Sequence, residues 1–457
     1  MKRLFALRKQ RFVRDAVALQ IATAVTGVTY FVTSVLTERY LGIVDLGRWN
    51  AARTIFTMAF FFMTMGVLNS TVSRYSEAVG RQSREDGVRA LAGMLKIGAI
   101  SSLIVLVLGF TLGPWVGERF YGDRDVGSWA AILCIAGLFE VVRGLTVAAL
   151  MGTRQMKEYA WFDVTTNVLR VGIVWAALHA GLGIGGVVGA FLLHMLVAGA
   201  MAVRWYQKAR DGHAKLAPPP LREVFLAAPR APVGHIFGLS YLLALNKGMN
   251  TLVPQFGMLL IPALGVASAD LDAQTASFRA NGHYGIAWVL SWGAGLAMTG
   301  VAYTLLPALG LKLGGSDVSF EEMGGIFRRV SLGAGLFMVA ATVLSVPVAW
   351  FAITFAYGPD AAGSFPYFLW LVSGNLFLGF TVVVDAFYIY SGHLKRAVRL
   401  NFLLAGSALV GIILAGRHFG PIGVAAAAGL CRGLALIHLV YMGWYFRRAR
   451  ERKQDQQ

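Results

Sequence analysis

Residues 94–112 read MLKIGAISSLIVLVLGFTL, an apolar run whose single charged residue is Lys96. A helix needs about 20 largely apolar residues to cross the ~30 Å hydrocarbon layer of a bilayer, and this run meets that need. Comparable runs recur along the whole chain, so we expect an all-α polytopic membrane protein with about 12 transmembrane helices. The expected spans are 16–36, 55–72, 94–112, 129–151, 162–182, 184–203, 240–264, 286–309, 330–356, 365–388, 401–414 and 422–444.

Composition supports a membrane protein. Of the 457 residues, 57% are hydrophobic and only 14% are charged, with a mean hydropathy of +0.62. Soluble domains have about one half apolar and one quarter charged residues. The only two cysteines, Cys134 and Cys431, fall inside predicted spans, where we expect them to act as packing residues rather than as a disulfide or a metal site.

The net charge of +18 raises the question of nucleic-acid binding. If the N-terminus is cytoplasmic, most of the 41 lysines and arginines lie on the cytoplasmic side of the predicted spans. This positive-inside distribution predicts an even number of spans with both termini in the cytoplasm. The basic residues therefore indicate topology and an attraction to membrane lipids with anionic headgroups, and we expect no nucleic-acid partner.

The chain is expected to contain two similar halves. The longest polar break, 204–230, predicts a six-helix half at 1–210, a cytoplasmic linker at 211–231 and a second six-helix half at 232–457. Shifting the chain by 240 residues aligns Gly183 with Gly423, and Lys208-Ala209-Arg210 with Arg448-Ala449-Arg450. An even displacement of six spans makes the repeat parallel, and such halves in transporters enclose a cavity between them.

Two segments resemble a known family. They are TERYLGIVDLGRWNAARTIFTMAFFFMTMGVLNSTVSRYSE at 37–77 and SGHLKRAVRLNFLLAGSALVGIILAGRHFGPIGVAAAAGL at 391–430. Both are similar to polysaccharide transporters, the oligosaccharide-lipid flippase branch of the multidrug/oligosaccharidyl-lipid/polysaccharide (MOP) flippase superfamily. The resemblance implies alternating-access movement of a lipid-linked (polyprenyl-pyrophosphate) oligosaccharide across the bacterial cytoplasmic membrane for polysaccharide export. It implies other polysaccharide-assembly proteins as further partners and no enzymatic step.

Ionisable residues inside spans are functional candidates because burying a charge in a membrane is costly. Arg53, expected at the outer end of the second span, either meets a substrate phosphate or extends to the headgroups. Arg170 either lines the cleft or pairs with another residue. Arg143 lies three residues after Glu140, so we expect these two to form a structural ion pair.

Lys247 and Asn250 lie in a predicted span that also contains Pro254 and Pro262. A cation, an amide and two prolines together indicate a bent helix along a substrate path, although a lysine near a span end can also extend to the headgroups. Arg279, in the loop expected before the eighth span, is a further substrate-binding candidate at the outer mouth. An ordinary loop charge is the stronger interpretation of Arg279.

Asp385 is an acid deep in an otherwise apolar span. It is a candidate for coupling transport to a proton or Na⁺ gradient, although an ion pair with Arg432 is the slightly preferred interpretation, and such a pair near the cleft can also be functional. Residues 181–186, GLGIGG, match G-x-G-x-x-G but join two spans, so we expect a tight turn and not a dinucleotide site. The sequence has no Walker motif and no Cys/His cluster, so we expect no cofactor and no metal.

Two other functions remain open. An ion-coupled multidrug exporter would share the fold, but a cavity for cationic drugs should contain carboxylates, whereas the intramembrane cations here outnumber the acids. A multi-spanning glycosyltransferase or polymerase normally needs a substantial outer loop. The largest outer loop here, about 265–285, offers only Asp270 and Asp272.

Overall fold

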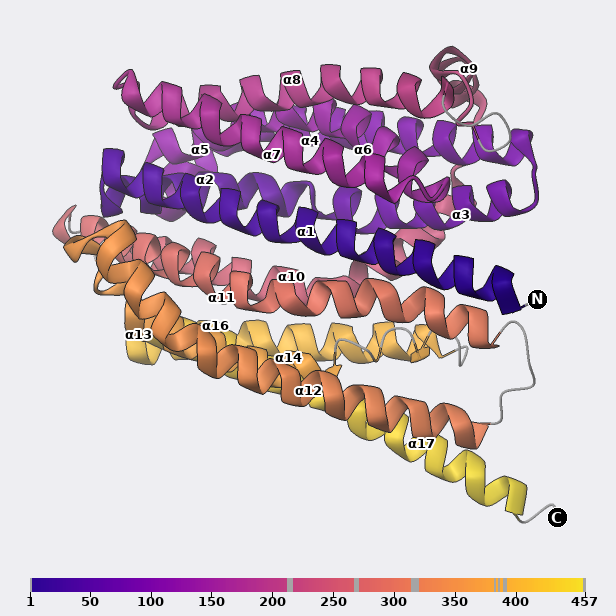
Figure 1. Cartoon of the computed structure of the whole chain (residues 1–457). Helices are drawn as coiled ribbons and strands as arrows, with labels where there is room; N and C mark the ends of the chain where they lie inside the picture. The colour runs from indigo at the N-terminus through magenta and orange to yellow at the C-terminus, as the bar shows by residue number, and fades with distance from the viewer. Residues whose placement is uncertain are drawn as a thin grey trace. The chain divides into compact units, whose positions relative to one another are not determined.

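The computed structural model describes residues 2–211, 217–266, 271–313, 320–381, 384, 387–388 and 393–454. Nearly all of these residues are helical, and none of them lies in a strand. In chain order the helices are α1 (Lys2–Leu41), α2 (Ile43–Ala59), α3 (Leu68–Gly80), α4 (Arg84–Tyr121), α5 (Arg124–Cys134), α6 (Ala136–Gly152), α7 (Met156–His179), α8 (Gly183–Asp211), α9 (Leu221–Ala227), α10 (Gly234–Val266), α11 (Leu271–Leu313), α12 (Phe320–Phe351), α13 (Ser364–Ser373), α14 (Asn375–Thr381), α16 (Leu394–Leu430) and α17 (Leu436–Gln454) (Figure 1).

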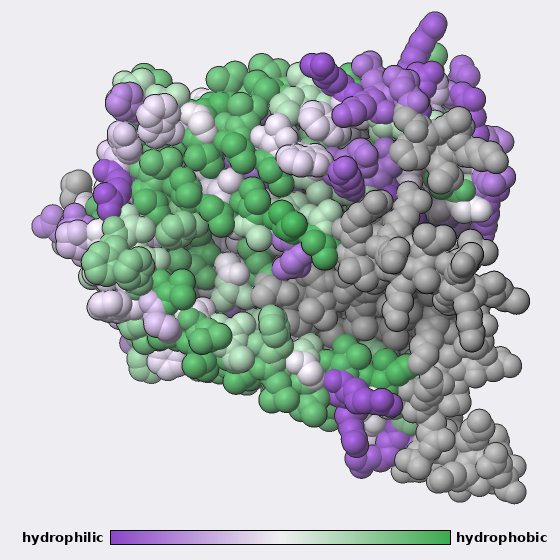
Figure 2. Space-filling model, in the orientation of Figure 1, coloured by the Kyte–Doolittle hydropathy of each residue, from purple (hydrophilic) through white to green (hydrophobic). Residues whose placement is uncertain are grey.

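The helices are long enough and apolar enough for a polytopic membrane protein, which confirms the predicted fold class. Within the described part of the chain, six helical segments meet the length and hydropathy needed to cross a bilayer. They are Val17–Leu41, Arg84–Tyr121, Arg124–Gly152, Gly183–Asp211, Met323–Tyr357 and Lys395–Arg448. Figure 2 shows hydrophobic side chains along the sides of the helices on this face. Hydrophilic side chains gather in the region where Figure 1 places α3 and α9.

The outward-facing side chains of the helices are apolar, unlike those of a water-soluble bundle. On α4, for example, Leu103 is 58% exposed and Val107 is 53% exposed. A surface helix of a soluble protein places polar residues on its outer face. The apolar outer face of α4 therefore suits contact with lipid.

The second span begins earlier than the sequence predicts. Helix α2 starts at Ile43 rather than at residue 55, and a π-helical segment, Phe62–Val67, connects it to α3. The first turns contain polar residues that lower the local hydropathy, but Arg48 has two acidic neighbours: Asp45 on the same helix at 2.8 Å and Asp123, just before α5, at 3.1 Å. Arg53 consequently lies about 15 Å along the helix from its start and not at the helix end.

Helix contacts divide the chain into two compact units. The first comprises Met1–Lys247 and Pro262–Gly282, and the second comprises Gly248–Ile261 and His283–Gln457, so that α10 and α11 contribute to both. In the first unit α1 packs against α7, α4 packs against α5 and α6, and α8 packs against α6 and α7. In the second unit α12 packs against α14 and α17, and α13 packs against α16. The predicted division into two six-helix halves at the 211–231 linker stays a prediction.

Two helix breaks occur at nearly equivalent positions of the expected repeat. Gly181 and Gly183 have positive φ angles of 69° and 61° in the turn between α7 and α8, as expected for a tight turn. Inside α16 the helix breaks at Gly420, which has a φ angle of 64°. The 240-residue shift of the repeat places the equivalent of Gly181 at residue 421, one residue later. Only glycine adopts these angles readily.

Candidate functional site

Two arginines from different helices lie against one tyrosine inside the first unit. Arg53 of α2 has its guanidinium carbon 5.2 Å from the centre of the Tyr30 ring of α1. Arg170 of α7 has its guanidinium carbon 3.8 Å from the same ring centre. The face of an aromatic ring attracts cations, so Tyr30 holds both positive charges within one small volume. We refer to Tyr30, Arg53 and Arg170 as the cationic cluster.

The cationic cluster is short of negative charge. Arg170 is only 6% exposed, and its Nη2 donates a long hydrogen bond of 3.4 Å to Thr29 Oγ1. Its Nε is buried without a hydrogen-bond partner among the described residues. Across the same described ranges, neither Arg53 nor Arg170 has a carboxylate oxygen within 4.0 Å. Because a buried charge without a counterion is costly, this arrangement favours an anionic ligand.

The nearby carboxylates are occupied by other partners. Glu140 accepts two hydrogen bonds from Arg143, at 2.6 and 2.7 Å, which confirms the pair predicted from their spacing. Asp163 Oδ2 accepts a hydrogen bond of 2.8 Å from Thr26 Oγ1. Asn167 donates to the same Thr26 oxygen at 3.1 Å. Arg143 neutralises Glu140, whereas the neutral hydroxyl of Thr26 leaves the charge of Asp163 in place. Arg53 and Arg170 together therefore exceed Asp163 by one positive charge.

The second unit contains one arginine in a similar environment. Arg432 Nη1 donates to Asn375 Oδ1 at 2.7 Å, and Asn375 Nδ2 donates to the Ser291 carbonyl at 2.8 Å. The Arg432 guanidinium carbon lies 5.3 Å from the centre of a Trp288 ring. Asp385, its predicted partner, lies outside the described residues, so their pairing stays a prediction.

The remaining predicted site residues lie on two helices. Lys247 and Asn250 belong to α10, but their side chains lie outside the described part of the structure. Arg279 is exposed on α11 and not in a loop, because the expected loop is helical from Leu271 onward. Polar residues of this segment bond to the first part of the chain: Asn281 Nδ2 donates to the Gly47 carbonyl at 2.8 Å, and Gln274 Nε2 donates to the Tyr121 carbonyl at 2.7 Å.

No motif in the sequence marks Tyr30, the residue that brings Arg53 and Arg170 together. Its only sequence signal is that it is one aromatic residue among the apolar residues of the first span. The role of Tyr30 depends on α1 packing beside α7 and α2, which the sequence of one helix does not reveal. Asp163 and Thr26 meet across the same interface between α1 and α7.

Comparisons with known proteins agree with this fold. The family model described as "Polysaccharide biosynthesis protein" matches residues 12–263. No curated protein matches the chain.

Three solved structures with a similar fold are described as MATE proteins. A multidrug resistance MATE family transporter of the MOP superfamily in its inward-facing conformation has a TM-score of 0.71 and 13% identity, over 95% of this chain and 99% of its own. An outward-facing structure of such a transporter also has a TM-score of 0.71, with 15% identity over 97% of each chain. A MATE structure in complex with Br-NRF has a TM-score of 0.64 and 15% identity, over 97% of each chain. At these identities the likeness shows the fold alone, and it does not distinguish between the two conformations.

Proposed function

Because the chain belongs to the polysaccharide biosynthesis protein family, whose model matches residues 12–263, we propose that it is a flippase for a lipid-linked oligosaccharide. Its substrate is a polyprenyl-pyrophosphate saccharide, which crosses the bacterial cytoplasmic membrane by alternating access for polysaccharide export. Both termini are cytoplasmic, in keeping with the distribution of basic residues. Other polysaccharide-assembly proteins supply and consume the substrate.

The physical obstacle to this movement is the polar headgroup. Each unpaired polar group in hydrocarbon costs several kcal/mol, and a pyrophosphate carries negative charge as well. The observation that supports the proposal most strongly is the pair of guanidinium groups on Tyr30, neither of which has a carboxylate oxygen within 4.0 Å among the described residues. Arginine binds phosphate oxygens through parallel hydrogen bonds, so Arg53 and Arg170 replace the water that the pyrophosphate loses.

The other predicted residues have supporting roles in this proposal. Lys247 and Asn250 on α10 provide a further cation and an amide along the substrate path. Arg279 contacts the headgroup near the outer mouth. Asp385 couples transport to an ion gradient by binding a proton or Na⁺. Binding and moving the substrate require no covalent bond to be made or broken, so the protein acts as a transporter and not as an enzyme.

A transport assay that compares substrates tests this proposal. The purified protein is reconstituted in liposomes with one of three probes: a labelled polyprenyl-pyrophosphate saccharide, the same saccharide on an uncharged lipid, or a cationic dye. We expect protein-dependent flipping of the pyrophosphate lipid and slow movement of the other two. Equal flipping of the charged and uncharged saccharide lipids would contradict a role for the cationic cluster.

An ion-coupled multidrug exporter is the second candidate. The specific observation in its favour is the structural likeness to MATE transporters over at least 95% of the chain. In the same liposomes, accumulation of the cationic dye on a proton or Na⁺ gradient, without movement of any saccharide lipid, would favour the exporter. The cationic cluster opposes this alternative because it would repel a cationic drug.

A further inference from the structure

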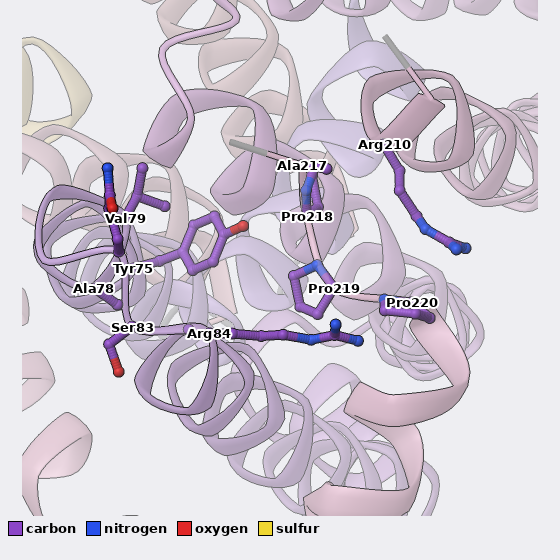
Figure 3. Close-up of a pocket in the computed structure, with 12 residues that line it drawn as sticks. Tyr75, Ala78, Val79, Ser83, Arg84, Arg210, Ala217, Pro218, Pro219 and Pro220 are labelled. Carbon is purple, nitrogen blue, oxygen red and sulfur yellow. The ribbon is translucent and has the colours of Figure 1, made fainter. Parts of the chain in front are cut away.

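A cavity of about 570 Å³ lies at one end of the first unit. Its wall combines the end of α3, the turn into α4, the end of α8 and the proline segment 218–220 (Figure 3). The basic residues predict that this end is cytoplasmic. The cavity is distinct from the cationic cluster: none of its lining residues belongs to α1, α2 or α7.

Tyr75 is held rigidly with its hydroxyl in this cavity. The residue is only 2% exposed. Its ring is enclosed by two glycines: a Cβ on Gly152 would overlap the ring, and a Cβ on Gly87 would lie 3.2 Å from it. Figure 3 shows the hydroxyl turned toward the 218–220 segment, and the hydroxyl makes no hydrogen bond to the described residues. The oxygen itself is open to the cavity and is not enclosed by protein, so it can donate a hydrogen bond to a ligand there.

The polar groups around Tyr75 are mainly hydrogen-bond donors. The Arg84 and Arg210 side chains extend beside the proline segment (Figure 3). Arg84 pairs with Glu223 at 2.6 Å through one of its nitrogens, whereas Arg210 makes no ion pair within the described ranges. Burial raises the pKa of Tyr75, so its hydroxyl keeps its proton and donates.

The acceptors and the shape of the wall also fit an anion. The Pro219 carbonyl already accepts a hydrogen bond of 2.7 Å from Tyr206, which fixes the proline segment and occupies one of the two lone pairs of this carbonyl. The proline backbone has no N–H groups, so the donors to a ligand come from side chains. Two guanidinium groups and one phenol around a space of this size match a phosphate ester.

We propose that Tyr75, Arg84 and Arg210 form a second, separate binding site for a phosphate ester, such as the headgroup of an anionic phospholipid of the bilayer. Basic pockets between helices on the cytoplasmic side of membrane proteins bind such headgroups. The site does not depend on the identity of the transported substrate. A soluble phosphate ester has the same chemistry, and the experiment below separates the two sources.

The test measures ligand binding by the full-length protein. In nanodiscs containing equal amounts of phosphatidylglycerol and phosphatidylcholine, we expect native mass spectrometry to show preferential retention of phosphatidylglycerol. Tyr75→Phe, which keeps the ring, should weaken retention by about fivefold to tenfold because it removes one hydrogen bond. Arg84→Gln combined with Arg210→Gln should abolish the preference. Arg204→Gln is the matched control, since exposed Arg204 lies on α8 outside the cavity and its replacement should leave retention unchanged.

A parallel titration with soluble glycerol phosphate distinguishes the source of the ligand. Binding of glycerol phosphate that depends on Tyr75 and Arg210, without retention of phosphatidylglycerol, would support the site and identify its ligand as soluble. If neither compound binds, or if all variants bind like the wild type, the proposed site is wrong. An unfolding midpoint for Tyr75→Phe within a few degrees of the wild-type value verifies that this variant is folded.

Discussion

The guanidinium carbon of Arg170 lies 3.8 Å from the centre of the Tyr30 ring, so α7 and α1 are joined by a buried cation–aromatic contact. Arg53 of α2 approaches the same ring at 5.2 Å. Two like charges near one ring repel each other, and the ring face offsets only part of that repulsion. An anionic headgroup between the two arginines would remove the repulsion, which connects this packing feature with the proposed transport.

Tyr30 should therefore be needed for transport mainly through its ring. We expect Tyr30→Leu to reduce the flipping rate at least about tenfold, because a loss of ~2 kcal/mol of cation–aromatic contact leaves Arg53 and Arg170 without a fixed position. Tyr30→Phe keeps the ring and should retain most of the activity. The rates are measured in liposomes with the labelled pyrophosphate lipid. Equal rates for Tyr30→Leu and the wild type would show that the ring does not position the arginines.

The Glu140–Arg143 pair should act on stability. Glu140→Gln leaves Arg143 without its bidentate partner, and breaking a buried pair on one side costs about 3–5 kcal/mol. Thermal unfolding in detergent should show a clearly lower midpoint. Glu140→Gln combined with Arg143→Met removes both charges and should recover much of the loss. A single variant as stable as the wild type would mean that Asp163 or water replaces Glu140.

Close helix packing in the first unit gives a prediction about two glycines. A Cβ on Gly127 of α5 would overlap the Gly113 carbonyl of α4, whereas a Cβ on Gly172 of α7 would meet nothing within 4 Å. Gly127→Ala should therefore lower stability by about 1–3 kcal/mol through overpacking. Gly172→Ala should raise stability by roughly 0.5–1 kcal/mol because alanine favours a helix. Unfolding midpoints that change in the same direction for both variants would contradict this packing.

The proposed coupling residue Asp385 has its own test. Asp385→Asn removes the charge that would bind a proton or Na⁺, so the flipping rate should no longer respond to an imposed gradient of either ion. Asp272→Asn is the control, because Asp272 is exposed in the first turn of α11 and the response should persist. A gradient response that remains in Asp385→Asn would assign coupling to another residue.

The sequence predicts the fold well because hydropathy is a local property of each helix. The long apolar run in α4 and the tight turn at Gly181 and Gly183 are both confirmed. The Glu140–Arg143 pair is also confirmed, since residues three apart share one helix face. The helix that contains the expected second span begins at Ile43, before the expected residue 55. Asp45 and Arg48 lower the hydropathy of its first turns, but the contact of Arg48 with Asp123 stabilises them.

The site is less predictable from the sequence, since it depends on which helices meet. Arg53 and Arg170 were identified as intramembrane cations, but Tyr30 joins them only through the packing of α1, α2 and α7. Arg279 was expected in a loop because its neighbours are polar, although those neighbours bond to other helices, as Asn281 does to Gly47. A polar segment such as the one around Arg279 can therefore be helical when other helices supply hydrogen-bond partners for its side chains.

The most direct test of the account is the flipping rate of the labelled pyrophosphate lipid in a variant with Arg53→Gln and Arg170→Gln. Arg119→Gln is the control for replacing an arginine outside the cationic cluster, since Arg119 is exposed at the end of α4. We predict that the double variant loses at least about a hundredfold in rate, as expected when two charge-assisted bonds of ~1.5 kcal/mol each are removed, while Arg119→Gln flips the lipid at the wild-type rate. A folded double variant that flips this lipid as fast as the wild type would contradict the central claim that the cationic cluster carries the headgroup.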